Sequence, residues 1–149
     1  MAGDLYLDDL HVGQRFAAGP VSVSTAEIKR FAAEFDPQPF HLDEVAAKAT
    51  IFGGLAASGW HTMALTMRML TSGGMPIATG VIGVGGEIAW PRPVRPGDEL
   101  RVESEVLEVR ASRSRPERGI VRVQSTTLNQ DDQPVMVQIA SLIVPRRPA

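Results

Sequence analysis

An acidic and a basic side chain lie within one short proline-rich segment, FDPQPFH, at residues 35–41. Four residues separate Asp36 from His41, and Pro37 and Pro39 fix the backbone angle φ at two of them. A carboxylate and an imidazole held near one water molecule can transfer protons, because imidazole titrates near neutral pH. From these residues alone, a helix-capping Asp36 and an ordinary loop histidine explain the segment equally well.

The remaining polar residues offer little other chemistry. The chain has three histidines and no cysteine, which excludes disulfides, thiolate metal ligands and a cysteine nucleophile. No group of His, Asp and Glu has the spacing of a metal site, so we expect no bound metal. We expect His61 to be a buried packing residue and His11 to be solvated. The glycines of GVIGVGGE do not fit a dinucleotide site, and they indicate instead a strand that a ligand or another backbone approaches closely.

Helix signals dominate the first half of the chain. Ser24 and Glu27 form a capping box at the start of residues 24–35, and this helix should end at Asp36, which precedes a proline. A short helix is expected over residues 43–49.

The longest helix is expected over residues 59–72. It is apolar on nearly all sides, which is typical of a buried helix, and Gly73 should end it. One apolar face is formed by Trp60, Met63, Ala64 and Met67 with Leu70 or Thr71, and another by Leu65 and Met69. Asp43 is expected to be the N-cap of the short helix over residues 43–49.

Alternating apolar residues dominate the second half of the chain. They predict four strands, over residues 79–90, 98–109, 119–129 and 134–144, and a weaker fifth strand over 12–22. A phase change at Leu107 indicates a β-bulge in the second strand. The first strand should present four residues on one face: Ile82, Val84, Ile88 and Trp90.

One long buried helix followed by antiparallel strands predicts a single α+β domain over residues 1–149. A curved sheet wrapped around the helix satisfies both patterns. This arrangement is the hot-dog fold, although the periodicity alone allows other α+β sandwiches.

Composition and charge exclude several classes of protein. Of the 149 residues, 44% are hydrophobic and no run is long enough to span a membrane. The N-terminus carries acids where a signal peptide carries positive charge, so we expect a cytoplasmic protein. A net charge of −2 gives no attraction to nucleic acid. Acids are interleaved with the arginines of residues 92–122, which favours a solvated strand face over a polyanion-binding stripe.

Three segments together resemble the MaoC-like dehydratases, a family of the hot-dog superfamily that includes the (R)-specific enoyl-CoA hydratases. Residues 36–41 are similar to the family's signature Asp-x-Asn-Pro-x-His, with Gln38 in the place of the Asn. The segment FGGLAASGWHTMAL resembles the start of the family's central helix, and WPRPVRPGDEL the segment that leads into a strand. The resemblance covers most of residues 30–110.

The resemblance implies that Asp36 and His41 together deprotonate a water molecule, which adds to C3 of a trans-2-enoyl thioester. It also implies that the N–H of Gly59 polarises the thioester carbonyl, and a helix N-terminus favours a developing negative charge there. A glycine needed only for close packing is the alternative explanation. Gln38 and Ser58 depart from the family pattern, and we expect both to contact the substrate.

The implied substrate is an acyl-CoA or acyl-carrier thioester, and no metal or organic cofactor is implied. We expect Arg92 and Arg95 to bind the phosphates of CoA. A single hot-dog unit leaves a sheet edge open, so we expect a homodimer or a dimer of dimers. Two other functions are considered: a hot-dog thioesterase with Asp36 as base or nucleophile, and a non-catalytic acyl-CoA-binding module.

Overall fold

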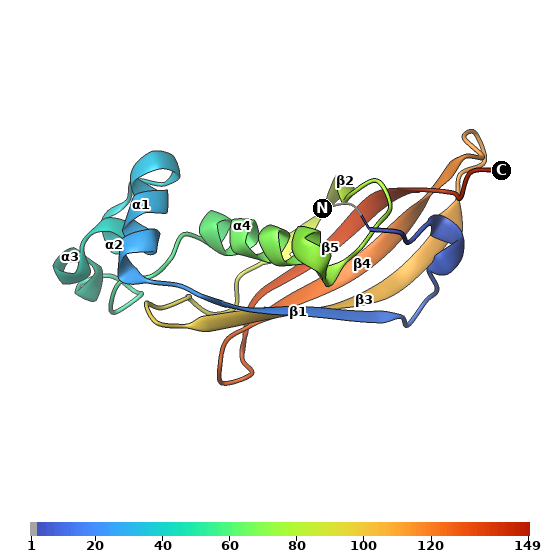
Figure 1. The fold of residues 1–149 in the computed structure, drawn as a ribbon. Helices are drawn as coiled ribbons and strands as arrows, with labels where there is room; N and C mark the ends of the chain where they lie inside the picture. The colour runs from blue at the N-terminus through green and yellow to red at the C-terminus, as the bar shows by residue number, and fades with distance from the viewer. Residues whose placement is uncertain (1–2) are drawn as a thin grey trace.

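The computed structural model describes residues 3–149, and its main layer is one antiparallel sheet (Figure 1). The strands follow the order β1-β3-β4-β5-β2 across the sheet. Their bounds are Arg15–Ser22 for β1, Ile82–Ala89 for β2, Glu99–Ala111 for β3, Arg118–Leu128 for β4 and Pro134–Pro145 for β5. The β3–β4 register shifts between Val106 and Glu108, which confirms the bulge predicted at Leu107.

Helix α4, Gly59–Met69, runs along the sheet and continues as a wider turn over Leu70–Gly74 (Figure 1). This arrangement confirms the predicted α+β hot-dog fold. Apolar residues of β3 and β4 alternate into the core that the helix covers. Among residues 3–149, none of the helices is both long and apolar enough to cross a membrane.

Of the two predicted apolar faces of α4, the one with Leu65 and Met69 is buried, whereas the face that begins at Trp60 is not buried as a whole. Trp60 is 58% exposed and Ala64 is also exposed, whereas Thr62 and Thr66 are buried. Two hydroxyl contacts make this possible: Thr66 Oγ1 donates to the carbonyl of Thr62 at 2.9 Å and lies 2.6 Å from the hydroxyl of Thr127. Because their polar atoms are satisfied, threonines can occupy the face that contacts the sheet.

The prediction that one face of β2 carries Ile82, Val84, Ile88 and Trp90 is wrong. The β2–β5 register shifts between Gly83 and Gly85, so the alternation reverses at Val84. Ile82 and Ile88 therefore lie on opposite faces of the sheet. The prediction of a closely approached strand is confirmed at Gly86, where an added Cβ would lie 2.1 Å from the carbonyl oxygen of Ile139 on β5.

Three short helices gather near the N-terminal end of α4, beyond the end of the sheet (Figure 1). Their bounds are Thr25–Phe35 for α1, Pro39–Leu42 for α2 and Glu44–Lys48 for α3. The predicted capping box is confirmed: the Ser24 hydroxyl accepts from the N–H of Glu27 at 3.1 Å, and the Glu27 carboxylate accepts from the N–H of Ser24 at 3.2 Å. The Asp43 carboxylate caps α3, also as predicted.

Helix α2 was not predicted. It is a single turn that begins at Pro39, where the fixed φ of proline suits the first helical position. This turn contains His41, so the imidazole projects from a helix and not from a loop.

Candidate active site

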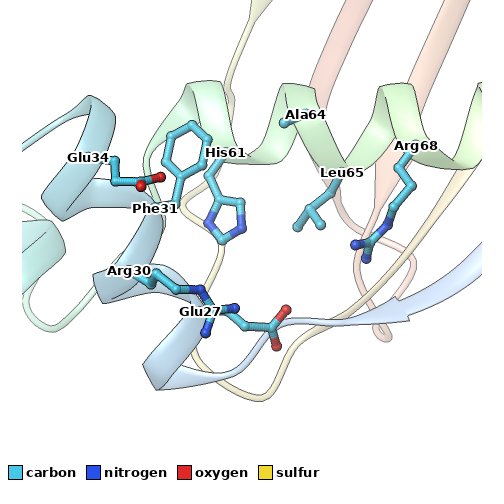
Figure 2. A pocket seen from close by; sticks show the side chains of 8 residues that line it. All are labelled: Glu27, Arg30, Phe31, Glu34, His61, Ala64, Leu65 and Arg68. Carbon is cyan, nitrogen blue, oxygen red and sulfur yellow. The ribbon is translucent and has the colours of Figure 1, made fainter.

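One cavity that borders the N-terminal half of α4 is built around His61. It has a volume of about 360 Å³ and lies between α1 and α4 (Figure 2). The His61 ring stacks on Phe31 with 4.6 Å between centroids, and its Nδ1 has no hydrogen-bond partner among residues 3–149. Burial lowers the pKa of His61. These contacts confirm that His61 is a buried packing residue.

The charged residues of this larger cavity balance one another. Two acids and two arginines line it: Glu27, Glu34, Arg30 and Arg68. Within the described chain, no carboxylate bonds to the His61 imidazole. The cavity therefore lacks an acid–base pair, despite its size.

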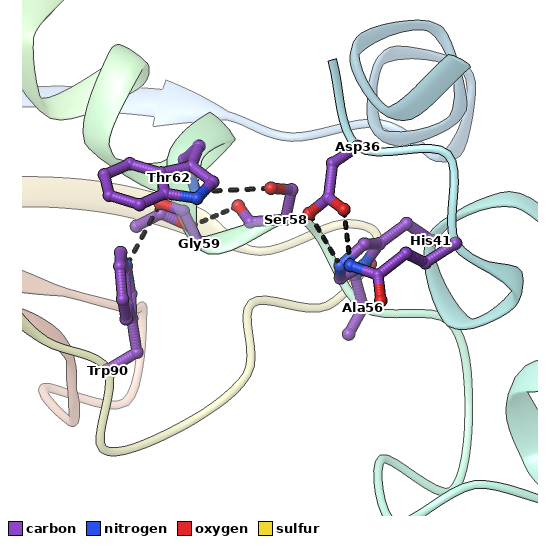
Figure 3. Close-up of polar contacts among 9 residues, drawn as sticks. Asp36, His41, Ala56, Ser58, Gly59, Thr62 and Trp90 are labelled. Atoms are coloured by element: carbon purple, nitrogen blue, oxygen red, sulfur yellow. Dashed lines mark hydrogen bonds and ion pairs between the residues drawn. The ribbon is translucent and has the colours of Figure 1, made fainter. Parts of the chain in front are cut away.

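The smaller cavity, about 280 Å³, contains the predicted dyad. Asp36 lies directly after α1 as its C-cap, and α2 turns His41 back toward it. His41 Nε2 lies 3.3 Å from Asp36 Oδ2 (Figure 3). The proline-rich segment thus brings the two groups together across four intervening residues.

The orientation of His41 is fixed on both sides of its ring. The side chain is 4% exposed, and Nδ1 lies 2.6 Å from the carbonyl oxygen of Ala56. A carbonyl can only accept, so Nδ1 carries the hydrogen, and in the neutral imidazole Nε2 is an acceptor. Phe40 contacts the ring edge-on, with 4.6 Å between centroids. His41 therefore presents a lone pair toward the same space as the Asp36 carboxylate.

The Asp36 carboxylate is held by two neighbours. Burial by itself raises its pKa, but hydrogen bonds from Ser58 and Gln38 and the nearby His41 outweigh this effect, so the pKa lies below its usual value. The Gln38 side-chain amide donates to Oδ1. Gln38 and Ser58 therefore both contact Asp36, and the carboxylate is ionised and an acceptor at neutral pH.

The N-terminus of α4 forms the opposite wall of the cleft. Ser58 is its N-cap and accepts from the N–H of Trp60 at 3.2 Å. Gly59 is the first helical residue, so its N–H has no carbonyl acceptor within the helix. This N–H lies where the helix dipole favours negative charge.

Gly59 also has a packing role. The Trp90 indole N–H donates to its carbonyl oxygen at 3.0 Å (Figure 3), and an added Cβ would lie 2.6 Å from the Trp90 ring. Any larger residue would push Trp90 away. Close packing thus requires a glycine at this position, and its role toward a thioester carbonyl stays a prediction.

The two predicted phosphate-binding arginines have different surroundings. Arg92 is exposed and lines the cleft, and it has no hydrogen bond or ion pair within residues 3–149. Arg95 is half-buried and donates to three backbone carbonyls, those of Phe52, Gly54 and Leu55. The contacts thus favour Arg92 over Arg95 as a ligand for phosphate.

Sequence reasoning missed three parts of this site. The Ala56 carbonyl, the Trp90 indole and the Phe52 ring all contact or border the dyad or the helix start. A backbone carbonyl gives no signal in a sequence, Trp90 lies 31 positions from Gly59, and no local pattern indicates the ring contact between Phe52 and His41. In the part of the chain that the structure describes, no three His, Asp or Glu side chains gather to hold a metal ion.

Comparison with known proteins places these features in context. Residues 10–129 match the family model described as the MaoC like domain. The crystal structure of a MaoC-like dehydratase from Rhodospirillum rubrum is 57% identical and has a TM-score of 0.96, covering 97% of this chain and 99% of that chain.

Two relatives are similar in sequence over nearly the whole chain. YdeM of Bacillus subtilis (strain 168), described as an uncharacterized protein, is 35% identical over 141 residues, which cover 94% of this chain and 99% of that protein. The 3-hydroxybutyryl-CoA dehydratase of Methylorubrum extorquens is 31% identical over 144 residues, which cover 96% of this chain and 86% of that enzyme.

Proposed function

Because the chain belongs to the family of MaoC-like dehydratases, we propose that it catalyses the reversible addition of water to a trans-2-enoyl thioester. The product of hydration is the (R)-3-hydroxyacyl thioester. The observation that carries this proposal is the Asp36–His41 pair, whose two acceptor atoms lie 3.3 Å apart in one cleft with the N–H of Gly59. The relative named as a 3-hydroxybutyryl-CoA dehydratase supports the same reaction class.

In the proposed reaction, one water molecule donates a hydrogen to each of Asp36 Oδ2 and His41 Nε2. As the water oxygen bonds to C3, the pair takes one of its protons, and the C2=C3 π electrons move toward the thioester carbonyl. The pair then delivers the proton to C2 as the enolate collapses. One water is added in total, and no electron donor or acceptor is needed.

The N–H of Gly59 is proposed to stabilise the enolate oxygen. A donor fixed at a helix N-terminus needs no reorganisation when charge develops, and one such donor contributes about 10²–10³ in rate. Asp36, His41 and the N–H of Gly59 thus supply the proton transfer and the charge stabilisation that the reaction needs. We therefore propose no metal or organic cofactor. The Trp90 hydrogen bond to the Gly59 carbonyl restrains the next peptide group, which joins Gly59 to Trp60.

The proposed substrate is a CoA or acyl-carrier thioester, and the cytoplasm is the expected location. Arg92 stands at the mouth of the cleft with a free guanidinium and is proposed to contact a phosphate. Trp60 and Trp90 lie beside it in an edge-to-face pair with 5.3 Å between ring centroids. These aromatic residues form an apolar wall for the rest of the substrate.

A direct assay separates this proposal from the thioesterase and binding-module alternatives. We expect the purified protein to remove the enone absorbance of trans-2-enoyl-CoA substrates of several chain lengths without releasing free thiol. Free thiol formed at the rate of substrate loss would identify a thioesterase. Binding without any loss of substrate would identify a binding module, and either result contradicts the proposal.

We also propose that the protein is a homodimer or a dimer of dimers. Strand β2 is an edge strand on which Ile82 and Val84 are exposed. A groove of about 290 Å³ follows it, bordered by Trp60 and Met63 of α4. An exposed apolar edge is normally paired or covered. Sedimentation should give a multiple of 16.0 kDa at micromolar concentration, whereas a monomer alone would contradict the proposal.

A further inference from the structure

Arg95 is bound to the backbone of the loop that precedes α4. Its Nη1 donates to the carbonyl oxygens of Gly54 at 2.9 Å and Leu55 at 3.2 Å, and its Nη2 donates to that of Phe52. These carbonyls belong to residues 49–58, which lie between α3 and α4 and form no regular ladder of hydrogen bonds of their own. One side chain thus satisfies three acceptors of an irregular segment.

The segment that Arg95 holds supplies the contact that orients the catalytic imidazole. The residue after Leu55 is Ala56, whose carbonyl oxygen lies 2.6 Å from His41 Nδ1. The N–H of Ala56 in turn donates to the carbonyl of Phe40 at 3.0 Å. A shift of the loop would therefore change the partner that determines which nitrogen of His41 carries the hydrogen.

Arg95 projects from a turn that is itself fixed. Its backbone N–H donates to Asp98 Oδ2 at 2.9 Å, and Asp98 Oδ1 accepts from Gln130 Nε2 at 3.0 Å. Asp98 is buried. The residue before Arg95 also bonds to the loop, because the carbonyl of Val94 accepts from the N–H of Ala57 at 2.9 Å. The guanidinium therefore links a rigid turn to the loop.

Arginine is suited to this task because its planar guanidinium carries five N–H donors in a fixed fork. Lysine has three donors at one point on a flexible chain and cannot span three carbonyls in the same way. A guanidinium already bonded to three carbonyls also has few donors left for a phosphate. Both points distinguish Arg95 from the exposed Arg92.

We propose that Arg95 is a positioning residue, which fixes the Ala56 carbonyl and thereby holds His41 in the Nδ1–H tautomer with Nε2 facing Asp36. Its effect on turnover rests on the proposed function, whereas its effect on the imidazole does not. Loss of the guanidinium frees the loop to move, and a misplacement of about 1 Å costs up to about 10²-fold in rate.

The first experiment compares two substrates that differ in their phosphates. Crotonyl-CoA and the phosphate-free crotonyl thioester of N-acetylcysteamine are assayed with Arg95→Met, Arg95→Lys and the matched control Arg113→Met, which alters an exposed arginine of the β3–β4 loop. We expect Arg95→Met to lower kcat about 10- to 100-fold on both substrates, with Arg95→Lys intermediate and Arg113→Met unchanged. A raised KM with unchanged kcat, seen with crotonyl-CoA only, would show that Arg95 binds phosphate and would overturn the proposal.

The second experiment does not require activity. Nitrogen-15 NMR of the histidine rings reports directly which nitrogen of His41 carries the hydrogen. We expect the Nδ1–H form in the wild type and a mixture of tautomers in Arg95→Met, with the resonances of His61 unchanged as a sign that the fold is intact. An unchanged His41 spectrum in a folded Arg95→Met or Arg95→Lys protein would overturn the proposal, even if the hydratase assay of the wild type had failed.

Discussion

Two histidines of this chain are almost equally buried, yet their polar surroundings differ. His41 is 4% exposed, and its ring nitrogens lie near the Ala56 carbonyl and the Asp36 carboxylate. His61 is 6% exposed, and its Nδ1 has no partner within the described residues. Each ring also contacts a phenylalanine. The difference lies in hydrogen bonding and not in burial.

Under the proposed function, these hydrogen-bond partners are what a buried imidazole needs in order to transfer protons. A carbonyl at one nitrogen fixes the tautomer of His41, and a carboxylate at the other shares the position where a water would bind. Burial alone has a different effect: it lowers the pKa of His61 and keeps its ring neutral. His61, in the larger cavity, therefore has a packing role, and the smaller cavity is suited to the proposed catalysis.

The largest expected effect comes from removing either member of the dyad. Asp36→Asn and His41→Ala should each lower kcat for enoyl-CoA hydration by about 10²–10⁴. The matched control, His61→Gln, changes an equally buried histidine and should leave kcat within about threefold of the wild type, since His61 touches no reacting group. A loss in His61→Gln as large as that in His41→Ala would remove the distinction between the two sites.

A smaller effect is expected from Ser58, whose hydroxyl helps to lower the pKa of Asp36. The proposed activity requires ionised Asp36, so it should be lost as the pH falls through the pKa of this carboxyl. In Ser58→Ala that pKa should rise, so the acid limb of the kcat/KM profile should move to higher pH, with a loss of about tenfold in kcat/KM.

The control for Ser58→Ala is Ser24→Ala, which removes the N-cap of α1 and costs about 1 kcal/mol of stability without touching the Asp36 side chain. Its acid limb should match that of the wild type. If both variants shift alike, the change reflects loss of a helix cap and not loss of the contact with Asp36.

A several-fold effect is expected from Arg92, which is exposed at the rim of the cleft. Arg92→Ala should raise KM for an enoyl-CoA about threefold and leave kcat unchanged, because the contact is remote from the reacting carbons. Added salt should reduce the difference from the wild type. With the phosphate-free thioester, the variant and the wild type should have equal KM values. A change in KM with this substrate would show that Arg92 contacts another part of the substrate.

The smallest effect concerns His61 and appears in stability. Its folded pKa lies below the unfolded value, so the unfolded chain binds this proton more readily and the free energy of unfolding falls as the pH drops below about 6.5. Glu27 and Arg30 of α1 and Arg68 of α4 also act on the ring. Denaturant unfolding should show that the free energy of unfolding falls less between pH 7 and pH 5 in His61→Leu than in the wild type. An equal fall in both proteins would contradict this role of His61.

Local signals in the sequence predicted much of the frame that carries the site. The Ser24–Glu27 box begins α1 and Asp36 ends it, whereas for the dyad the spacing to His41 left two explanations open and the resemblance to the MaoC-like dehydratases favoured the pair. Each of these features depends on residues within a few positions of one another. Local signals therefore sufficed for the bounds of α1 but not for the dyad.

Other parts depend on contacts between distant residues and were missed or predicted wrongly. Ala56 meets His41 across 15 positions and Trp90 meets Gly59 across 31, and no pattern in either segment indicates the pairing. The bulge after Gly83 reversed the expected face of β2. Buried hydroxyl pairs such as that of Thr66 decided which face of α4 meets the sheet.

Asp36 and His41 are proposed to act as one unit on one water molecule. The most direct test of this proposal is a double-mutant cycle on kcat with Asp36→Asn, His41→Ala and the combined variant, each confirmed to be folded. Groups that act as a unit give losses that do not multiply, so the combined variant should be scarcely slower than the slower single variant. Losses that multiply in full would show that the two residues act independently and not on one shared water molecule.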